Sequence, residues 1–176
     1  MERPVTIAVA LVLVAAALAA ITDVRTRRIP NLLVAALLVC GLSLSALSGW
    51  KAAGGDLLIV AIVMVAGTFL FSLKLIGGGD VKLLAAAAGT LGFPDCVFFI
   101  LCTLIGGGFI AVAYAALRGR LRATFANVQS MAIPVFAGVR PARPDGTPMP
   151  YALAIFAGAL CTAFVNAFAP HLRLLP

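Results

Sequence analysis

Residues 5–28 read VTIAVALVLVAAALAAITDVRTRR, an apolar run from Val5 to Thr22 that is followed at once by Asp23 and then by three arginines. A run of about 20 apolar residues is long enough to cross the hydrocarbon core of a bilayer as a helix. Positive charges directly after such a run are typical of its cytoplasmic end. Because a carboxylate is costly to keep at that boundary, Asp23 marks a candidate functional site.

The same apolar pattern continues along the whole chain. Of the 176 residues, 63% are hydrophobic and only 11% are charged, against about 25% charged in a soluble domain. Five more apolar runs follow, at residues 31–48, 57–73, 81–93, 96–117 and 151–169. The sequence therefore predicts an all-α, polytopic membrane protein of about six transmembrane helices that form a single domain over residues 1–176. It gives no indication of the oligomeric state.

The basic residues predict the orientation of these helices. Ten of the 13 lysines and arginines follow the first, third and fifth runs, which places those loops in the cytoplasm and both termini outside. The net charge of +7 therefore indicates contact with anionic lipid and not with nucleic acid. Residues 118–150 are expected to include an interfacial helix on the cytoplasmic surface. The first run could instead be a signal peptide, but its positive cluster follows the run, which favours a retained span.

The second acidic site lies in Gly77-Gly78-Gly79-Asp80-Val81-Lys82-Leu83, just before the fourth run. That run has only 13 residues, about 20 Å of helix. Residues 77–80 are therefore expected to dip below the membrane surface beside a watery cavity. The three glycines would permit unusual backbone dihedrals and a close approach of an extended substrate. Packing the first run against the fourth would bring Asp23 and Asp80 together.

Two carboxyl groups held close together can activate water. They do not both ionise easily, so one keeps its proton and the pair titrates as a coupled unit. The ionised carboxylate would take a proton from water while the protonated one polarises a scissile carbonyl. Simpler roles also fit, because Asp23 could pair with Arg27 one turn further on and Asp80 could be an N-cap. Lys82, about 200° around a helix from Asp80, would meet lipid, tune the pair or bind substrate.

No metal or cofactor is expected. The four cysteines form no Cys-x-x-Cys pair and the chain has one histidine, so a zinc site is not indicated. The cysteines are expected to be packing residues, and nothing in the sequence requires a disulfide.

Asp23 with Ile29-Pro30-Asn31, together with residues 77–83, resembles the type IV prepilin peptidases of the Gly-x-Gly-Asp class, most closely the short form that serves Flp/Tad pili. The resemblance implies an aspartic endopeptidase of the bacterial inner membrane. It implies that Asp23 and Asp80 catalyse removal of the basic leader from prepilins or pseudopilins at the cytoplasmic membrane face, with Gly77, Gly78 and Gly79 supporting the site.

The resemblance is weaker near the last apolar run. Pro150-Tyr151 matches a Pro-aromatic motif of the family, but Ala152 stands where the family usually has glycine. The N-terminal segment with two Cys-x-x-Cys pairs, which larger members carry for N-methylation, has no counterpart in the sequence, so no methyltransferase activity is expected.

Two readings of a different class remain open. Carboxylates beside a broken membrane helix also suit a small ion-coupled transporter, which would place them near the bilayer midplane within inverted repeats. A non-catalytic subunit of a pilus or secretion assembly would tolerate the loss of both aspartates.

Overall fold

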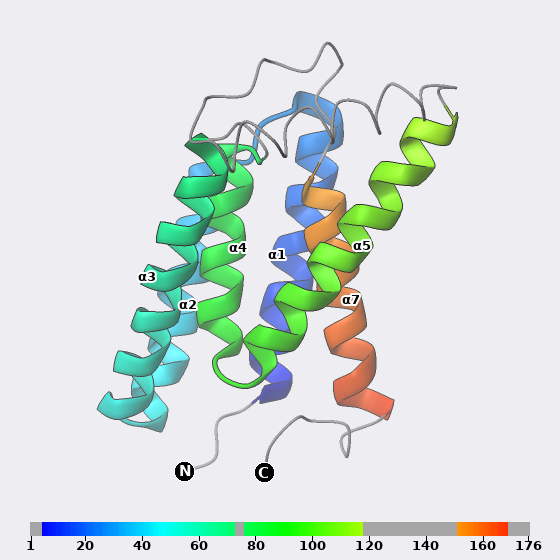
Figure 1. The fold of residues 1–176 in the computed structure, drawn as a ribbon. Helices are drawn as coiled ribbons and strands as arrows, with labels where there is room; N and C mark the ends of the chain where they lie inside the picture. The colour runs from blue at the N-terminus through cyan, green and yellow to red at the C-terminus, as the bar shows by residue number, and fades with distance from the viewer. Residues whose placement is uncertain (1–4, 73–75, 118–150, 169–176) are drawn as a thin grey trace.

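The computed structural model describes residues 5–72, 76–117 and 151–168. All regular structure in these ranges is helical: α1 spans Val5–Thr26, α2 Asn31–Ser48, α3 Trp50–Ser72, α4 Gly78–Leu91, α5 Asp95–Leu117 and α7 Ala152–Phe168. Successive helices run in alternating directions through one bundle (Figure 1). The predicted all-α class is thus confirmed for the described part of the chain. The expected interfacial helix at 118–150 lies outside the described residues.

Four of the helices, α1, α2, α3 and α5, are long and apolar enough to cross a membrane. The other two are shorter, since α4 has 14 residues and α7 has 17. Large apolar side chains such as Leu47, Phe69 and Phe109 are exposed on the outside of the bundle, where lipid would cover them. The architecture is that of a polytopic helical membrane protein, with length and composition supporting four of the six predicted crossings.

Helix α4 is the centre of the bundle. It contacts each of the other five described helices and lies between the α2–α3 pair and the group of α1, α5 and α7 (Figure 1). Nine of its residues are buried. Because protein surrounds it, a short alanine-rich helix is sufficient, and small residues let its neighbours come close. A methyl group at Gly41 would collide with Thr90, and one at Gly67 would collide with Val81.

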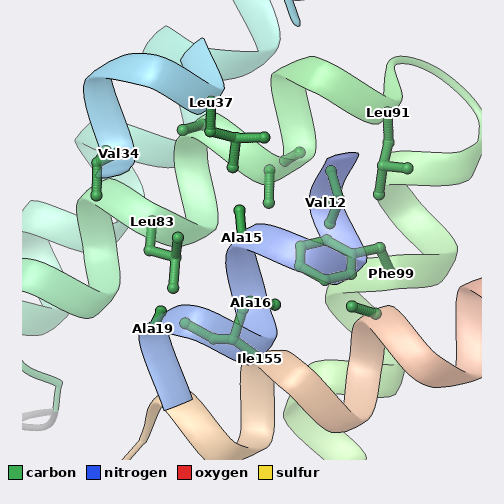
Figure 2. Close-up of a cluster of buried hydrophobic side chains, with 14 of the residues drawn as sticks. Val12, Ala15, Ala16, Ala19, Val34, Leu37, Leu83, Leu91, Phe99 and Ile155 are labelled. Atoms are coloured by element: carbon green, nitrogen blue, oxygen red, sulfur yellow. The ribbon is translucent and has the colours of Figure 1, made fainter. Parts of the chain in front are cut away.

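The core lies where α1, α4, α5 and α7 meet (Figure 2). Phe99 and Ile155 are fully buried and pack with the alanines of α1, among them Ala15, Ala16 and Ala19. Lipid tails are as apolar as these side chains, so close van der Waals packing, not escape from water, holds such helices together. The first apolar segment thus supplies a central part of the core.

Helix α1 continues past the predicted end at Thr22 to Thr26. The Thr26 hydroxyl donates to the Thr22 carbonyl at 2.8 Å, and the Arg27 backbone N–H donates to the Asp23 carbonyl at 2.8 Å. Arg27 has a φ of 52°, a left-handed conformation that ends the helix. Asp23 therefore lies within the last turn of α1 and not in the loop behind it.

Helix α3 begins earlier than the sequence analysis expected, at Trp50 and not at residue 57. Asp56 is consequently a helical residue and is only 5% exposed. Gly54 and Gly55 precede it, and a helix with support from neighbouring helices tolerates such glycines despite their low propensity. The predicted start of the third run at residue 57 was therefore seven residues too late.

Candidate active site

Asp23 and Asp80 lie at the same end of the bundle. Asp23 is in the last turn of α1 and Asp80 is in the first turn of α4. We call this end, where α1 ends and α2, α4 and α7 begin, the Asp80 end (Figure 1). The two side chains are close enough for the charge of Asp23 to act on the carboxyl group of Asp80. The fold thus brings both aspartates to one end of the bundle.

The carboxyl group of Asp80 sits in a partly dry environment at the helix start. Asp80 precedes the apolar stretch that begins at Val81, and α4 is not among the four helices long enough to span a membrane. Its Oδ1 atom is buried and has no hydrogen-bond partner among the described residues. Burial, then the charge of Asp23, raise the pKa of Asp80 to about 6, against a lowering effect of a hydrogen bond from the Gly77 backbone. Asp80 therefore keeps its proton below about pH 6, and a minor fraction stays protonated at neutral pH. A catalytic carboxyl pair requires one protonated member.

The glycines before Asp80 do not have the unusual backbone dihedrals that the sequence analysis allowed for. Gly77 has the ordinary extended dihedrals φ −73° and ψ 146°, and Gly78 and Gly79 lie within α4. Unusual dihedrals are thus not the reason for this run. A Cβ at Gly77 would lie 2.6 Å from Asp80 Oδ2, and one at Gly79 would lie 3.4 Å from the Ile29 Cβ. These glycines make room for the carboxyl group of Asp80 and for the loop that follows α1.

The two sequence motifs contact each other. Ile29 packs against Gly79, and the ammonium group of Lys82 donates to Asn31 Oδ1 at 3.5 Å. The carbonyl of Pro30 accepts hydrogen bonds from the first turn of α2. The loop that follows Asp23 is therefore held on the first turn of α4, which carries Asp80. Lys82, expected to meet lipid or serve the site, is exposed and has this link to α2.

The simpler roles for the aspartates find little support. In residues 5–72, where both side chains are described, no ion pair joins Asp23 to Arg27, because the helix ends between them with Arg27 exposed. Asp80 is the third residue of α4 and Gly77 is the N-cap. Asp80 does help to cap the helix, since the Gly77 backbone donates a hydrogen bond to it. Capping leaves Oδ1 available for chemistry.

Tyr151 is a further titratable residue at this end of the bundle. It directly precedes α7 at the Asp80 end, and its side chain is half-buried. Burial and the charge of Asp80 raise its pKa, so the phenol keeps its proton. The sequence contained one signal for it, the Pro-aromatic motif at residues 150–151.

No metal site is formed by residues 5–72, 76–117 and 151–168, since no three of their His, Cys, Asp and Glu side chains come together. The four cysteines are free thiols. The Sγ atoms of Cys102 in α5 and Cys161 in α7 lie 3.1 Å apart. The chemistry that the described residues offer at this end is that of carboxyl groups: Asp80 with a raised pKa, and Asp23, whose charge contributes to that rise.

Fold and site together define a helical membrane protein with two aspartates at one end of its bundle. The model of the type IV leader peptidase family matches residues 10–112, a range that contains α2 to α4, most of α1 and α5, and both aspartates. The chain belongs to this family, and it is accordingly a membrane protease. Comparison with curated proteins and with solved structures found no significant match.

Proposed function

We propose that the protein is an aspartic endopeptidase that removes the basic leader peptide from type IV prepilins, of the Flp type, or from pseudopilins. The observation that carries the proposal is the carboxyl group of Asp80, with one buried oxygen unpaired, a pKa raised to about 6 and Asp23 nearby. A pair of carboxyls in which one stays protonated is the arrangement that water activation requires. Membership of the leader peptidase family supports the substrate class.

The raised pKa of Asp80 supports a division of roles between the two aspartates. Ionised Asp23 takes a proton from water while the water oxygen bonds to the scissile carbonyl carbon, and Asp80 gives its proton to the carbonyl oxygen. The resulting gem-diol collapses when Asp23 passes its proton to the leaving nitrogen and the C–N bond breaks. Asp80 then recovers a proton from a diol hydroxyl, and both groups return to their starting states.

The site belongs at the cytoplasmic face of a bacterial inner membrane in this proposal, with both termini on the opposite side. Arg25, Arg27 and Arg28 are exposed at the Asp80 end, as the positive-inside rule requires of a cytoplasmic end. The two acidic side chains suit a basic leader. The surrounding arginines suit lipid phosphates and would hold this end at the membrane surface.

The transporter reading receives less support. A coupled transporter binds its ion near the bilayer midplane, whereas Asp23 and Asp80 occupy the last turn of one helix and the first turn of another. An assembly subunit would not need a carboxyl group with a raised pKa and an unpaired buried oxygen. The endopeptidase is the function that these features favour.

Co-expression with a Flp-type prepilin tests the proposal. The wild-type protein should shorten the prepilin by its leader, seen as a gel shift and confirmed by mass. Asp23→Asn and Asp80→Asn should each abolish the shift while the protein still accumulates in the membrane. Failure of a folded wild-type protein across several prepilins, or normal cleavage by either variant, would overturn the proposal.

A further inference from the structure

We propose that Cys102 of α5 and Cys161 of α7 form a modification site, a thiol pair that a quinone dissolved in the lipid oxidises to a reversible disulfide. The disulfide fastens α5 to α7. The two Sγ atoms lie 3.1 Å apart, and both cysteines are free thiols. The inference does not rest on the proposed function, because neither thiol lies at the Asp80 end and no step needs a prepilin.

Helices α5 and α7 lie side by side (Figure 1), and their backbones approach closely. A Cβ built at Gly158 would collide with the side chain of Thr103 and lie 2.9 Å from the Thr103 backbone nitrogen. One turn further along α5, a Cβ at Gly107 would lie 3.1 Å from the Ala154 Cβ. From Thr103 to Gly107 the facing residue thus moves back from Gly158 to Ala154. This is the register of a regular antiparallel helix pair.

That register brings the two thiols together. Cys102 directly precedes Thr103, and Cys161 follows Gly158 by three residues, which places it on the same side of α7. The contact between the sulfur atoms therefore follows from the packing of the two backbones. A disulfide has an S–S bond of about 2.05 Å, so the sulfur atoms must approach by only about 1 Å from their distance of 3.1 Å.

Both thiols lie within the apolar part of the bundle. Cys102 is about two turns after the start of α5 at Asp95, and Cys161 is about two turns before the end of α7 at Phe168. Cys161 is exposed and lines an open groove of about 530 Å³, whose other lining residues are all apolar: Leu160, Ala163, Phe164, Ala167 and Phe168. Lipid would cover this face, so a reagent that reaches Cys161 arrives through the hydrocarbon.

This location selects the class of oxidant. Charged oxidants in water enter hydrocarbon poorly, whereas a quinone dissolves in it and accepts two electrons. The sulfur of Cys161 bonds to the quinone, and the sulfur of Cys102 then displaces the quinone and forms the S–S bond. Both S–H bonds break, and two protons and two electrons leave with the quinone as hydroquinone. A dithiol reverses the step by exchange and restores both thiols.

The disulfide would limit how far α5 and α7 can separate. It would close the chain from residue 102 to residue 161, and a cross-link stabilises a protein chiefly by restricting its unfolded states, more so for a longer loop. The thiol form leaves the two helices joined by packing alone at this contact. The oxidised protein should therefore resist unfolding better than the reduced one.

Oxidation of the whole chain in phosphatidylethanolamine vesicles by a short-chain ubiquinone tests the proposal. The intact mass should fall by two hydrogen atoms, and the number of thiols that react with maleimide after unfolding should fall from four to two. Peptide mapping should find Cys102 joined to Cys161 within one chain. Absence of this link would overturn the inference, as would a link between chains or equally fast oxidation by oxidised glutathione, which stays in water.

The variants separate this pair from the other thiols. Cys102→Ser and Cys161→Ser should each abolish the loss of two hydrogens, whereas Cys40→Ser, which removes an exposed thiol of α2, should leave it unchanged. A link that persists in either of the first two variants would overturn the assignment. The disulfide should raise the melting temperature of the wild-type protein by about 5 °C. An unchanged melting temperature would contradict the fastening of α5 to α7.

Gly158→Ala and Gly108→Ala test whether helix packing aligns the thiols. The first places a methyl group against Thr103, while the second meets open space, with nothing within 4 Å of a Cβ there. Gly158→Ala should slow disulfide formation at least about tenfold, because the sulfur atoms move apart, and Gly108→Ala should leave the rate unchanged. Equal rates in the two variants would overturn the packing argument. If Gly158→Ala does not fold, the serine variants still decide whether the pair forms the disulfide.

Discussion

Asp80 and Asp56 are both acidic residues inside helices of an apolar bundle, yet the fold treats them in opposite ways. Asp56 lies near the start of α3, away from the Asp80 end, is 5% exposed and has an interaction partner. Asp80 has a raised pKa and one buried oxygen for which the described residues supply no hydrogen-bond partner. A buried carboxylate that is satisfied contributes to structure, while one that is left unsatisfied stores free energy that chemistry can use.

The glycines near Asp80 and Asp56 also differ in what they leave space for. Around Asp80, Gly77 and Gly79 leave space for a carboxyl group and a loop. Near Asp56, Gly89 of α4 leaves space for the side chain of Val60, with which a Cβ there would collide, and for the Asp56 carbonyl oxygen, which would lie 3.3 Å from it. Glycine therefore leaves space for a carboxyl group at one end of α4 and for close packing against α3 at the other.

Substitution of the two aspartates should give opposite results. Asp80→Asn should lower cleavage more than about 1,000-fold, because it removes the acid of the pair, while Asp56→Ala should leave kcat within about threefold. The pKa of Asp80 is raised in the folded protein. The contribution of the protonated carboxyl group to the free energy of unfolding is therefore complete below about pH 4 and is lost as the pH rises through about 6. Asp80→Asn should therefore stabilise the protein at pH 8 by up to about 3 kcal/mol, at about 1.4 kcal/mol per pKa unit.

Asp56→Ala should instead destabilise by about 1–3 kcal/mol at the same pH, the cost of disrupting a buried polar interaction. Thermal unfolding in detergent at pH 8, set beside prepilin cleavage, measures both effects. If Asp80→Asn lowered stability, or Asp56→Ala abolished cleavage in the folded fraction, the contrast between the two residues would be lost.

The pH dependence of cleavage should follow Asp80. With a pKa of about 6 for the carboxyl that must stay protonated, kcat should fall about 50-fold between pH 6 and pH 8. Binding of a prepilin, measured by cross-linking to the Asp80→Asn variant, should change little over that range. A kcat that rises from pH 6 to pH 8 would reverse the assignment of acid and base to Asp80 and Asp23.

The sequence predicted the parts of this site that depend on local pattern. The apolar runs predicted the helices, and both predicted ends of α2 agree with the structure. The two aspartates were selected because acidic residues are rare beside such runs. The start of α3 was placed too late because residues 50–56 are less apolar than the run that follows, although the helix includes them. The closeness of Gly77 to Asp80 and of Gly79 to Ile29 depends on how the loops and helices pack, and no pattern along the chain states it.

Gly77→Ala tests the space beside Asp80. Its dihedrals allow alanine, so the effect should arise only from the Cβ placed 2.6 Å from Asp80 Oδ2. We expect kcat to fall about tenfold as the carboxyl group shifts, in line with the sensitivity of catalysis to small displacements. Gly54→Ala is the matched control, since nothing lies within 4 Å of a Cβ there; it should keep kcat and stabilise α3 by up to about 1 kcal/mol.

The smallest expected effect concerns the link between Lys82 and Asn31. Their 3.5 Å hydrogen bond is exposed, and exposed polar pairs contribute about 0.2–1 kcal/mol. Lys82→Met and Asn31→Leu should each lower kcat about threefold, because each loosens the contact between α4 and the loop that follows α1. The double variant should have a kcat no lower than that of either single variant. Asn31→Asp should preserve kcat, because an ion pair replaces the hydrogen bond. Additive losses in the double variant would mean that Lys82 and Asn31 act separately, with Lys82 serving the carboxyl pair or the substrate directly.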